Sequence, residues 1–211
     1  MEARVSKRII NFFGEEKTDL IFFLSYILNL KYRRKVLVID NTKKNILKMI
    51  VGVDEQDHLC KRKNVVYKLD GSEYEASLLR DYDIILNFVG YNIDLDQEYI
   101  NSRYSHNMVI TNMQKDAVSR CRKLIQAIDH EIDLIVTDCV ECDVSVGNVL
   151  FDLRYRIEKK IKRSFFLIYD INTYREFIKL QYGQNVTWEN LSVDMNELLY
   201  YMAELAVPYN G

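Results

Sequence analysis

Residues 9–20 of the chain read Ile9-Ile10-Asn11-Phe12-Phe13-Gly14-Glu15-Glu16-Lys17-Thr18-Asp19-Leu20. The apolar first part is typical of a buried strand, and the run stops at Gly14. A Lys-Thr pair follows and opens an apolar segment that is long enough for a buried helix. This order of strand, glycine, Lys-Thr and helix is the frame of a phosphate-binding loop, or P-loop.

The loop lacks most of the glycines that such a frame requires. In an intact loop, glycines let backbone N–H groups wrap around phosphate, the lysine reaches the terminal phosphates and the Thr hydroxyl binds the metal. Lys17 and Thr18 supply the last two groups, at the start of a helix whose dipole favours anions. Glu16 precedes the lysine where a glycine belongs, and its carboxylate would repel phosphate. The alternative interpretation is an exposed turn that Thr18 caps.

The bulk composition predicts one α/β domain spanning residues 1–211. Apolar residues make up 48% and charged residues 28%, which is ordinary for a globular protein. One proline and seven glycines argue against a turn-dense all-β fold. The net charge of −2 gives no overall attraction to nucleic acid or anionic membrane, so we expect neither as a partner. The basic clusters at 31–35, 61–63 and 154–163 are more simply interpreted as solvated faces.

We expect a cytoplasmic protein. The first residues are polar and show no signal-peptide core, and no apolar run approaches the roughly 20 residues that span a bilayer. The longest apolar run, at 20–30, is interpreted as a buried helix. Without a secretory signal, the four cysteines are expected to be reduced.

Strand-like apolar runs alternate with helix-like segments along the whole chain. We predict strands at residues 8–13, 35–40, 65–69, 83–89, 107–111, 133–137 and 165–169. We predict helices at residues 18–30, 43–51, 74–80, 95–103, 114–129, 146–162, 174–180 and 193–206. Continuous apolar runs are typical of parallel strands covered on both faces, and parallel strands need crossover helices. The sequence therefore predicts a three-layer α/β/α fold with a mostly parallel central sheet.

Ligands of such sheets bind beyond the carboxyl ends of the strands, so the residues there are site candidates. Asp40 ends the second predicted strand, where a carboxylate can hold a metal-bound water or, more simply, cap the next helix. Asn87 ends the apolar run of the fourth, where a metal-binding strand would end in aspartate. An amide brings no charge to Mg²⁺, and its alternative role is hydrogen bonding to local backbone groups.

The cysteines offer two further hypotheses. Cys139 and Cys142 form a CxxC, which together with His58 and Cys60 would make four zinc ligands. The two pairs are expected at opposite ends of the sheet, which argues against zinc. The CxxC also lacks the usual position of a redox motif at a helix start after a first strand. Plain reduced cysteines are favoured, and we assign no metal site.

Taken together, several segments resemble the MinD/ParA family of deviant-Walker P-loop ATPases, in order and over nearly the whole chain. They are 12–18 (the family's Lys-Gly-Gly-x-Gly-Lys-Thr loop), 35–40 (its second strand with the switch aspartate), 81–87 (its Walker B segment), 108–128 (its next strand–helix unit) and 167–184 (its late Tyr-Asp…Gly segment). The resemblance implies a P-loop NTPase-like fold, and a homodimer formed through the strand-end face.

The departures from that family pattern concern the catalytic groups. Phe12 stands where the family has its signature lysine, Phe13 and Glu16 replace loop glycines, and Asn87 replaces the Walker B aspartate. Thr137 and Asp138 stand where the family usually has an asparagine on the adenine side. The groups that keep the expected chemistry are Gly14, Lys17, Thr18 and Asp40.

Two hypotheses of function follow. The first is a non-hydrolysing scaffold or regulator that positions or assists proteins of a cytoplasmic assembly: pilus or secretion, partition, or cell-pole localisation. The alternative is a switch that still binds ATP or ADP with Mg²⁺ through Lys17, Thr18 and Asp40, with weak or no hydrolysis. A receiver-type domain fits less well, because Asn87 stands where an acceptor aspartate is needed. We assign no catalytic residue, and we predict a remnant nucleotide site at Gly14, Glu15, Glu16, Lys17, Thr18, Asp40 and Asn87.

Overall fold

The computed structural model describes residues 8–42, 46–51, 59–62, 65–69, 79–91, 105–143, 145–154 and 157–207. Its centre is an eight-stranded sheet with the strand order β3-β4-β2-β5-β1-β6-β7-β8. The strands are β1 (Arg8–Gly14), β2 (Val36–Asp40), β3 (Leu59–Arg62), β4 (Val65–Lys68), β5 (Ile84–Gly90), β6 (Ser105–Asn112), β7 (Ile132–Cys139) and β8 (Ile161–Ile168). Every neighbouring pair is parallel except β3 and β4. The predicted, mostly parallel sheet is confirmed.

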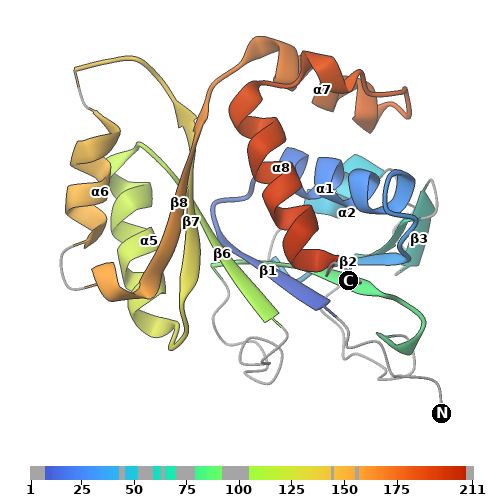
Figure 1. Cartoon of the computed structure of the whole chain (residues 1–211), viewed down its shortest axis with the longest axis horizontal. Helices are drawn as coiled ribbons and strands as arrows, with labels where there is room; N and C mark the ends of the chain where they lie inside the picture. Colours follow the sequence, from blue (N-terminus) through green and yellow to red (C-terminus); the bar gives the residue numbers. More distant parts are fainter. Residues whose placement is uncertain are drawn as a thin grey trace.

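Helices cover both faces of this sheet, as the crossover argument requires. They are α1 (Thr18–Leu30), α2 (Ile46–Val51), α5 (Lys115–Ala127), α6 (Val146–Arg154), α7 (Ile171–Gln181) and α8 (Val193–Ala206). Figure 1 shows α1, α7 and α8 on one face and α5 with α6 on the other. No helix among the described residues has the length and apolarity needed to cross a bilayer.

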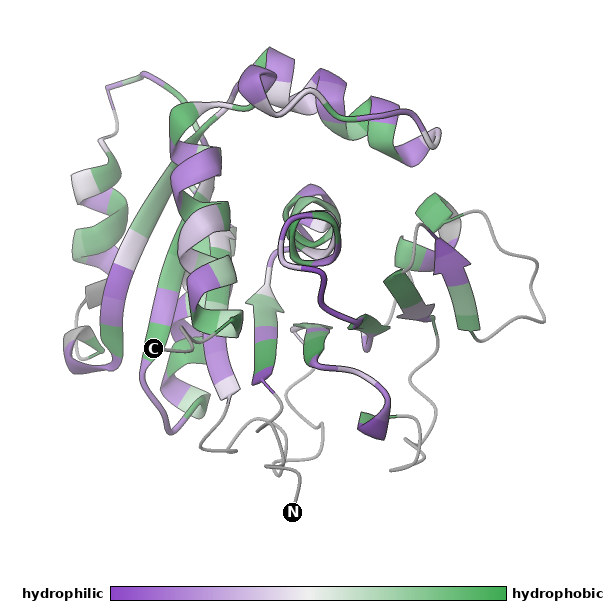
Figure 2. Cartoon of the chain, turned by 45° about the vertical axis from the view of Figure 1, so that its right-hand side comes forward, coloured by the Kyte–Doolittle hydropathy of each residue, from purple (hydrophilic) through white to green (hydrophobic). Residues whose placement is uncertain are grey.

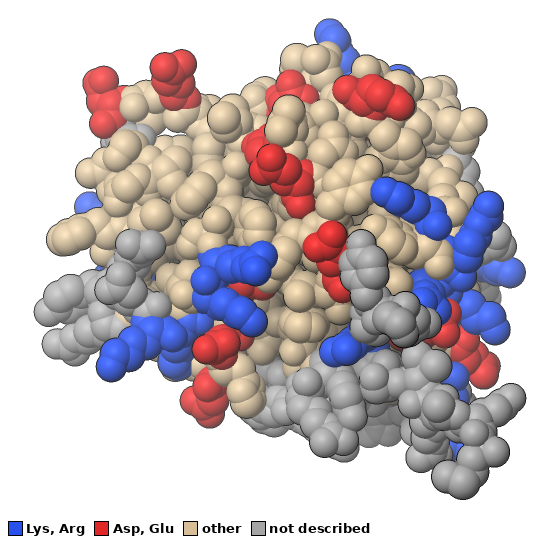
Figure 3. All heavy atoms as spheres, in the orientation of Figure 1, with Lys and Arg blue, Asp and Glu red and all other residues tan. Residues whose placement is uncertain are grey.

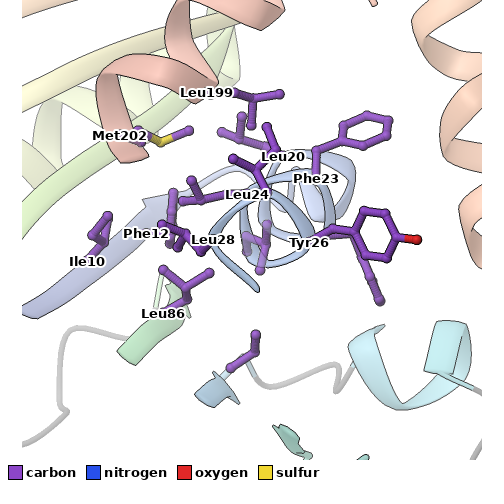
Figure 4. Close-up of a cluster of buried hydrophobic side chains, with 14 of the residues drawn as sticks. Ile10, Phe12, Leu20, Phe23, Leu24, Tyr26, Leu28, Leu86, Leu199 and Met202 are labelled. Carbon is purple, nitrogen blue, oxygen red and sulfur yellow. The ribbon is translucent and has the colours of Figure 1, made fainter. Parts of the chain in front are cut away.

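The central helix α1 is buried on all sides, which explains its apolar sequence. Every residue from 18 to 28 is buried, as expected of a helix that is apolar around its whole circumference. Figure 2 looks nearly along α1, which lies between the sheet and the outer helices. In Figure 4, Phe12 and Leu86 approach it from the sheet, and Leu199 and Met202 from α8.

All seven predicted strands are present, and helices 18–30 and 193–206 have the predicted bounds. The helix expected at 146–162 is wrong beyond Arg154, because Ile161–Ile168 is the edge strand β8. The first part of β8 is charged and exposed, which an edge strand tolerates. For this reason the sequence pattern did not indicate a strand there. The short β3 was missed. The helix predicted at 95–103 lies outside the described residues, as does all but the end of the one at 74–80.

Candidate functional site: a closed loop after the first strand

The loop between β1 and α1 is short because β1 continues as far as Gly14. Only Glu15, Glu16 and Lys17 then remain to reach α1. Gly14 has a φ of +92°, and a Cβ added there would lie 2.1 Å from the carbonyl oxygen of Ile110. The close approach of β6 therefore requires this glycine, whether or not phosphate is bound.

Two backbone donors of the loop are bonded within the protein. The Glu15 N–H donates to the Ile110 carbonyl at 2.9 Å, and the Lys17 N–H donates to the Glu15 carbonyl at 3.0 Å. A phosphate-binding loop instead aims such N–H groups at the anion. In this conformation two of the donors that would hold phosphate are occupied.

Lys17 is held by two carboxylates. Its ammonium lies 2.8 Å from Asp138 at the end of β7 and 3.5 Å from Asp19 in the first turn of α1. Burial lowers the pKa of Lys17, but the two carboxylates outweigh it and the pKa is raised. Asp19 is more deeply buried, and its desolvation raises the pKa of that carboxyl despite the nearby ammonium. Lys17 is therefore a charged, internally paired residue.

Glu15 is anchored by an ion pair that closes over the loop. Its Oε1 accepts hydrogen bonds from Arg120 of α5 at 2.8 Å and from the hydroxyl of Tyr91 at 2.7 Å. Arg120 also binds Asp116 at 2.6 Å and lies over the Tyr91 ring, 5.3 Å from its centroid. The hydrogen bonds that the guanidinium donates to Glu15, Tyr91 and Asp116 raise the pKa of Arg120, and the one to Glu15 is the largest cause. Glu15, predicted only as part of a remnant nucleotide site, thus ties the loop to α5 and to the residue that follows β5.

The space next to Lys17 is small. A pocket of about 30 Å³ lies between Lys17, Asp138, Tyr169, Tyr174 and the start of α8. That volume suits about one water molecule, whereas pockets for nucleotide-sized ligands measure roughly 300–1,000 Å³. Thr18, the expected metal-binding hydroxyl, is buried at the start of α1.

Asp40 caps the segment that leads into α2. One of its oxygens accepts the N–H and the hydroxyl of Thr42, at 2.9 and 2.6 Å, and the other accepts the N–H of Leu47 at 3.0 Å. Burial raises the pKa of this carboxyl, and the three hydrogen bonds oppose that shift. Both carboxylate oxygens of Asp40 are engaged. In this structure Asp40 is therefore a capping residue, which was the simpler of its two interpretations.

Asn87 lies inside β5 rather than at its end, because the strand continues to Gly90, and the expected position was wrong. Its Nδ2 donates to Asn11 Oδ1 at 2.9 Å, its Oδ1 accepts from Asn41 Nδ2 at 2.7 Å, and Asn11 Nδ2 donates to Asn107 Oδ1 at 2.9 Å. All four amides are buried. Asn87 therefore bonds the side chain of Asn11 in β1 and that of Asn41 just after β2, not the local backbone groups that the sequence suggested.

This asparagine row separates two apolar clusters on the α5 side of the sheet. Along β1, Ile9 belongs to one cluster and Phe13 to the other, with Asn11 between them. Along β5, Ile85 and Val89 flank Asn87 in the same way. The position that resembles a Walker B aspartate is thus part of an uncharged, internal hydrogen-bond network.

Comparison with solved structures shows which fold this is. The MinC:MinD cell division complex of Aquifex aeolicus has a TM-score of 0.68 at 15% identity, covering 97% of this chain and 99% of that one. McdA from Cyanothece, in its ATP complex, gives 0.63 at 13% identity (97% and 98% covered), and a ParA family ATPase from Chlorobium tepidum TLS gives 0.60 at 13% (93% and 97% covered). The chain has the MinD/ParA fold. No protein-family profile and no curated protein sequence matches it.

Within this fold, sequence analysis missed three site residues. Asp138 was noted only as a departure on the adenine side, yet it pairs with Lys17 and adopts a φ of +53°, which is uncommon for a residue other than glycine. Tyr91 and Arg120, which hold Glu15, were not singled out. An ion pair between residues more than 100 positions apart leaves no local signal in one sequence.

The zinc hypothesis does not fit the MinD/ParA fold. Cys60 lies on edge strand β3 and Cys139 on β7, with five strands between them, so roughly 25 Å or more separates them at about 4.8 Å per strand. Among the described residues, no group of three or more His, Cys, Asp or Glu could hold a metal ion. His58 lies outside those residues. The four cysteines lie within the described residues and form no disulfide there.

Proposed function

We propose that this chain is a nucleotide-independent scaffold or regulator, which uses a MinD/ParA fold to position or assist other proteins of a cytoplasmic assembly. The observation that carries the proposal is the bonding of the loop's own N–H groups: that of Glu15 to the Ile110 carbonyl and that of Lys17 to the Glu15 carbonyl. With these two backbone donors occupied, the loop lacks part of the cradle that phosphate would need.

The side chains of the loop support the same proposal. Phe12 and Phe13 are core residues on opposite faces of the sheet, so neither can reach a nucleotide or a second subunit. Asn87 contributes an amide where a metal-binding carboxylate would be needed. Each such charged contact is typically worth a few kcal/mol of transition-state stabilisation, about a hundredfold in rate.

A protein partner is supported by apolar side chains exposed at the strand-end face. They come from the ends of β7 and β8 and the starts of α7 and α8: Val140, Ile168, Tyr169, Ile171, Tyr174 and Val193. Exposed apolar groups gathered at one end of a domain are typical of interaction sites. The MinD of Aquifex aeolicus was solved in a complex with another protein, MinC.

The second candidate is a nucleotide-dependent switch, favoured by the retained Lys17 and Thr18. It requires Lys17 to exchange Asp138, whose side chain is 46% exposed, for a phosphate. It also requires the Glu15 and Lys17 N–H groups to leave their carbonyl partners. Both changes would be visible as a larger, nucleotide-stabilised pocket beside Lys17.

Thermal unfolding with ATP and Mg²⁺ separates the two candidates. Nucleotide at 100 times its dissociation constant should stabilise a binding protein by about 2.7 kcal/mol. We expect no Lys17-dependent shift at millimolar nucleotide. A shift that the wild type shows and Lys17→Ala loses would establish the switch and reject the scaffold proposal.

A further inference from the structure

A second concave site lies at the amino end of the central strands, away from the loop of residues 14–18. It is a pocket of about 450 Å³, within the range of small-molecule sites. Its basic wall consists of Arg33, Arg34, Lys35 and Lys61, and Val66 and Tyr82 form an apolar side. Figure 3 shows Lys and Arg side chains gathered at the right-hand edge of the molecule, where α1 ends and β2 begins.

The pocket unites two basic clusters that are far apart in the sequence. The turn after α1 supplies Arg33, Arg34 and Lys35, and β3 brings Lys61 beside them through its pairing with β4, the neighbour of β2. The sequence alone suggested that each cluster was a separate solvated face. The fold instead directs both into one hollow.

These four cations have no carboxylate partner in the part of the chain that the structure describes. Asp81 is the one carboxylate among the described lining residues. The carbonyl end of α1 adds about half a negative charge. The Asp83 carboxylate, which accepts the Lys35 N–H, adds a second negative charge beside the pocket. Four positive charges still exceed these negative ones, so the pocket favours anions.

Three basic side chains elsewhere in the described residues show how a cation can be held within the fold. Arg62 donates to the last carbonyls of α7, Lys160 donates to three carbonyls at the end of α5, and Arg120 binds two carboxylates. For the side chains of the four pocket cations, the structure gives no such acceptor among the residues that it describes. An anionic ligand would supply the missing acceptors.

The turn that carries the cations is held in place without them. The Asn29 side chain donates to the Arg34 carbonyl at 3.1 Å, and the Lys35 N–H donates to Asp83 at 2.9 Å. Arg33 takes a left-handed conformation with a φ of +54°. Because these backbone positions are fixed, a ligand would have to order only the side chains, which lowers the entropic cost of binding.

We propose that this pocket binds a small phosphorylated molecule. Guanidinium groups match phosphate oxygens in a bidentate geometry, and lysine adds point charges to the same anion. A concave pocket with an apolar side formed by Val66 and Tyr82 suits a small molecule better than the backbone of a duplex, which needs an extended basic face. The site is separate from Lys17 and does not depend on the proposed function.

Calorimetric titration of the full chain with inorganic pyrophosphate and with ADP tests this site, at a fixed ionic strength of about 0.15 M. We expect saturable binding that Arg34→Gln/Lys61→Gln weakens by about tenfold or more. The matched control is Lys123→Gln/Lys162→Gln, which removes two exposed charges outside the pocket and should bind like the wild type. Circular dichroism melting verifies that both variants are folded.

The same variants separate this proposal from the function proposed above. Binding lost in Arg34→Gln/Lys61→Gln but kept in Lys17→Ala supports the pocket and leaves the closed loop intact. Binding lost only in Lys17→Ala overturns both proposals. Three outcomes would overturn the pocket proposal alone. The first is that neither pyrophosphate nor ADP binds, and the second is that the control variant loses as much affinity as Arg34→Gln/Lys61→Gln. The third is that the protein binds duplex DNA or anionic vesicles and pyrophosphate does not compete with them.

Discussion

The ammonium of Lys17 lies 2.8 Å from the carboxylate of Asp138, although 121 positions separate the two residues in the chain. The pair joins the start of α1 to the end of β7, beside the loop of residues 15–17. Asp138 makes this contact from a left-handed backbone conformation. The residue that most resembles a nucleotide ligand is thus engaged inside the protein.

Asp138→Asn should release Lys17 without harming the fold, because asparagine tolerates left-handed backbone. The pair is partly exposed, so we expect a coupling with Lys17→Met of no more than about 1 kcal/mol in a double-mutant cycle. Urea unfolding measures it, and 1 M salt should reduce it, at a Debye length of about 3 Å. A coupling that is large and insensitive to salt would contradict this view of the pair.

Gly14→Ala should strongly destabilise the protein, by roughly 3 kcal/mol or more, because the new methyl meets the Ile110 carbonyl and φ is positive. Gly147→Ala is the matched control. Gly147 lies in α6 without a positive φ, and a Cβ there would lie 3.2 Å from the Ser145 Oγ, so alanine should change stability by no more than about 1 kcal/mol. Chemical denaturation compares the two, and equal effects would show that Gly14 is not structurally required.

The sheet was predictable because its strands are continuous apolar runs, such as Val36-Leu37-Val38-Ile39. The helix α1 was predictable because it is buried on nearly all sides and its sequence is correspondingly apolar. The strand β3 was not, because its four residues alternate between exposed and half-buried at a sheet edge. The partners of Glu15 and Lys17 come from distant elements, so only the folded chain brings them together. The sequence showed which chemical groups the loop carries, but it did not show that the loop is held closed by partners of Glu15 and Lys17.

Lys160→Met should destabilise the protein by about 1–2 kcal/mol, because the Lys160 ammonium donates to the carbonyls of Ile125, Gln126 and Ile128 at the end of α5. Carbonyl groups at the end of a helix have no N–H group of a following turn to accept from. Lys159→Met, at the exposed neighbouring position, removes the same charge and should change stability by less than about 0.5 kcal/mol. Thermal unfolding of both variants checks the difference, and an equal loss would assign the effect to charge alone.

The asparagine row left a signal that could have been used. Asn11, Asn87 and Asn107 each interrupt or begin an apolar strand run, where a polar residue needs a partner. Three such residues in strands of one parallel sheet suggest a cross-strand network. Their pairing still depends on the register of β1 with β5 and β6, which the sequence does not specify.

Asn87→Asp, which restores the carboxylate of the Walker B pattern, should destabilise the protein by roughly 3 kcal/mol at neutral pH. The Asn11 Oδ1 would lose its donor and face a buried negative charge. Burial raises the pKa of the introduced carboxyl above its unfolded value of about 3.9, so the native state binds its proton more tightly. The cost should therefore be small below that pH and grow as pH rises through the window up to the folded pKa.

Asn112→Asp is the matched control for that pH dependence. Asn112 is half-buried at the end of β6 and accepts the Gln114 N–H just before α5, so a carboxylate there keeps its acceptor and faces a helix N-terminus. It should be neutral or slightly stabilising above about pH 4, the opposite trend to Asn87→Asp. Urea unfolding of both variants from acid to neutral pH makes the comparison. If Asn87→Asp were tolerated at neutral pH and bound Mg²⁺, the row would be a latent metal site rather than an internal network.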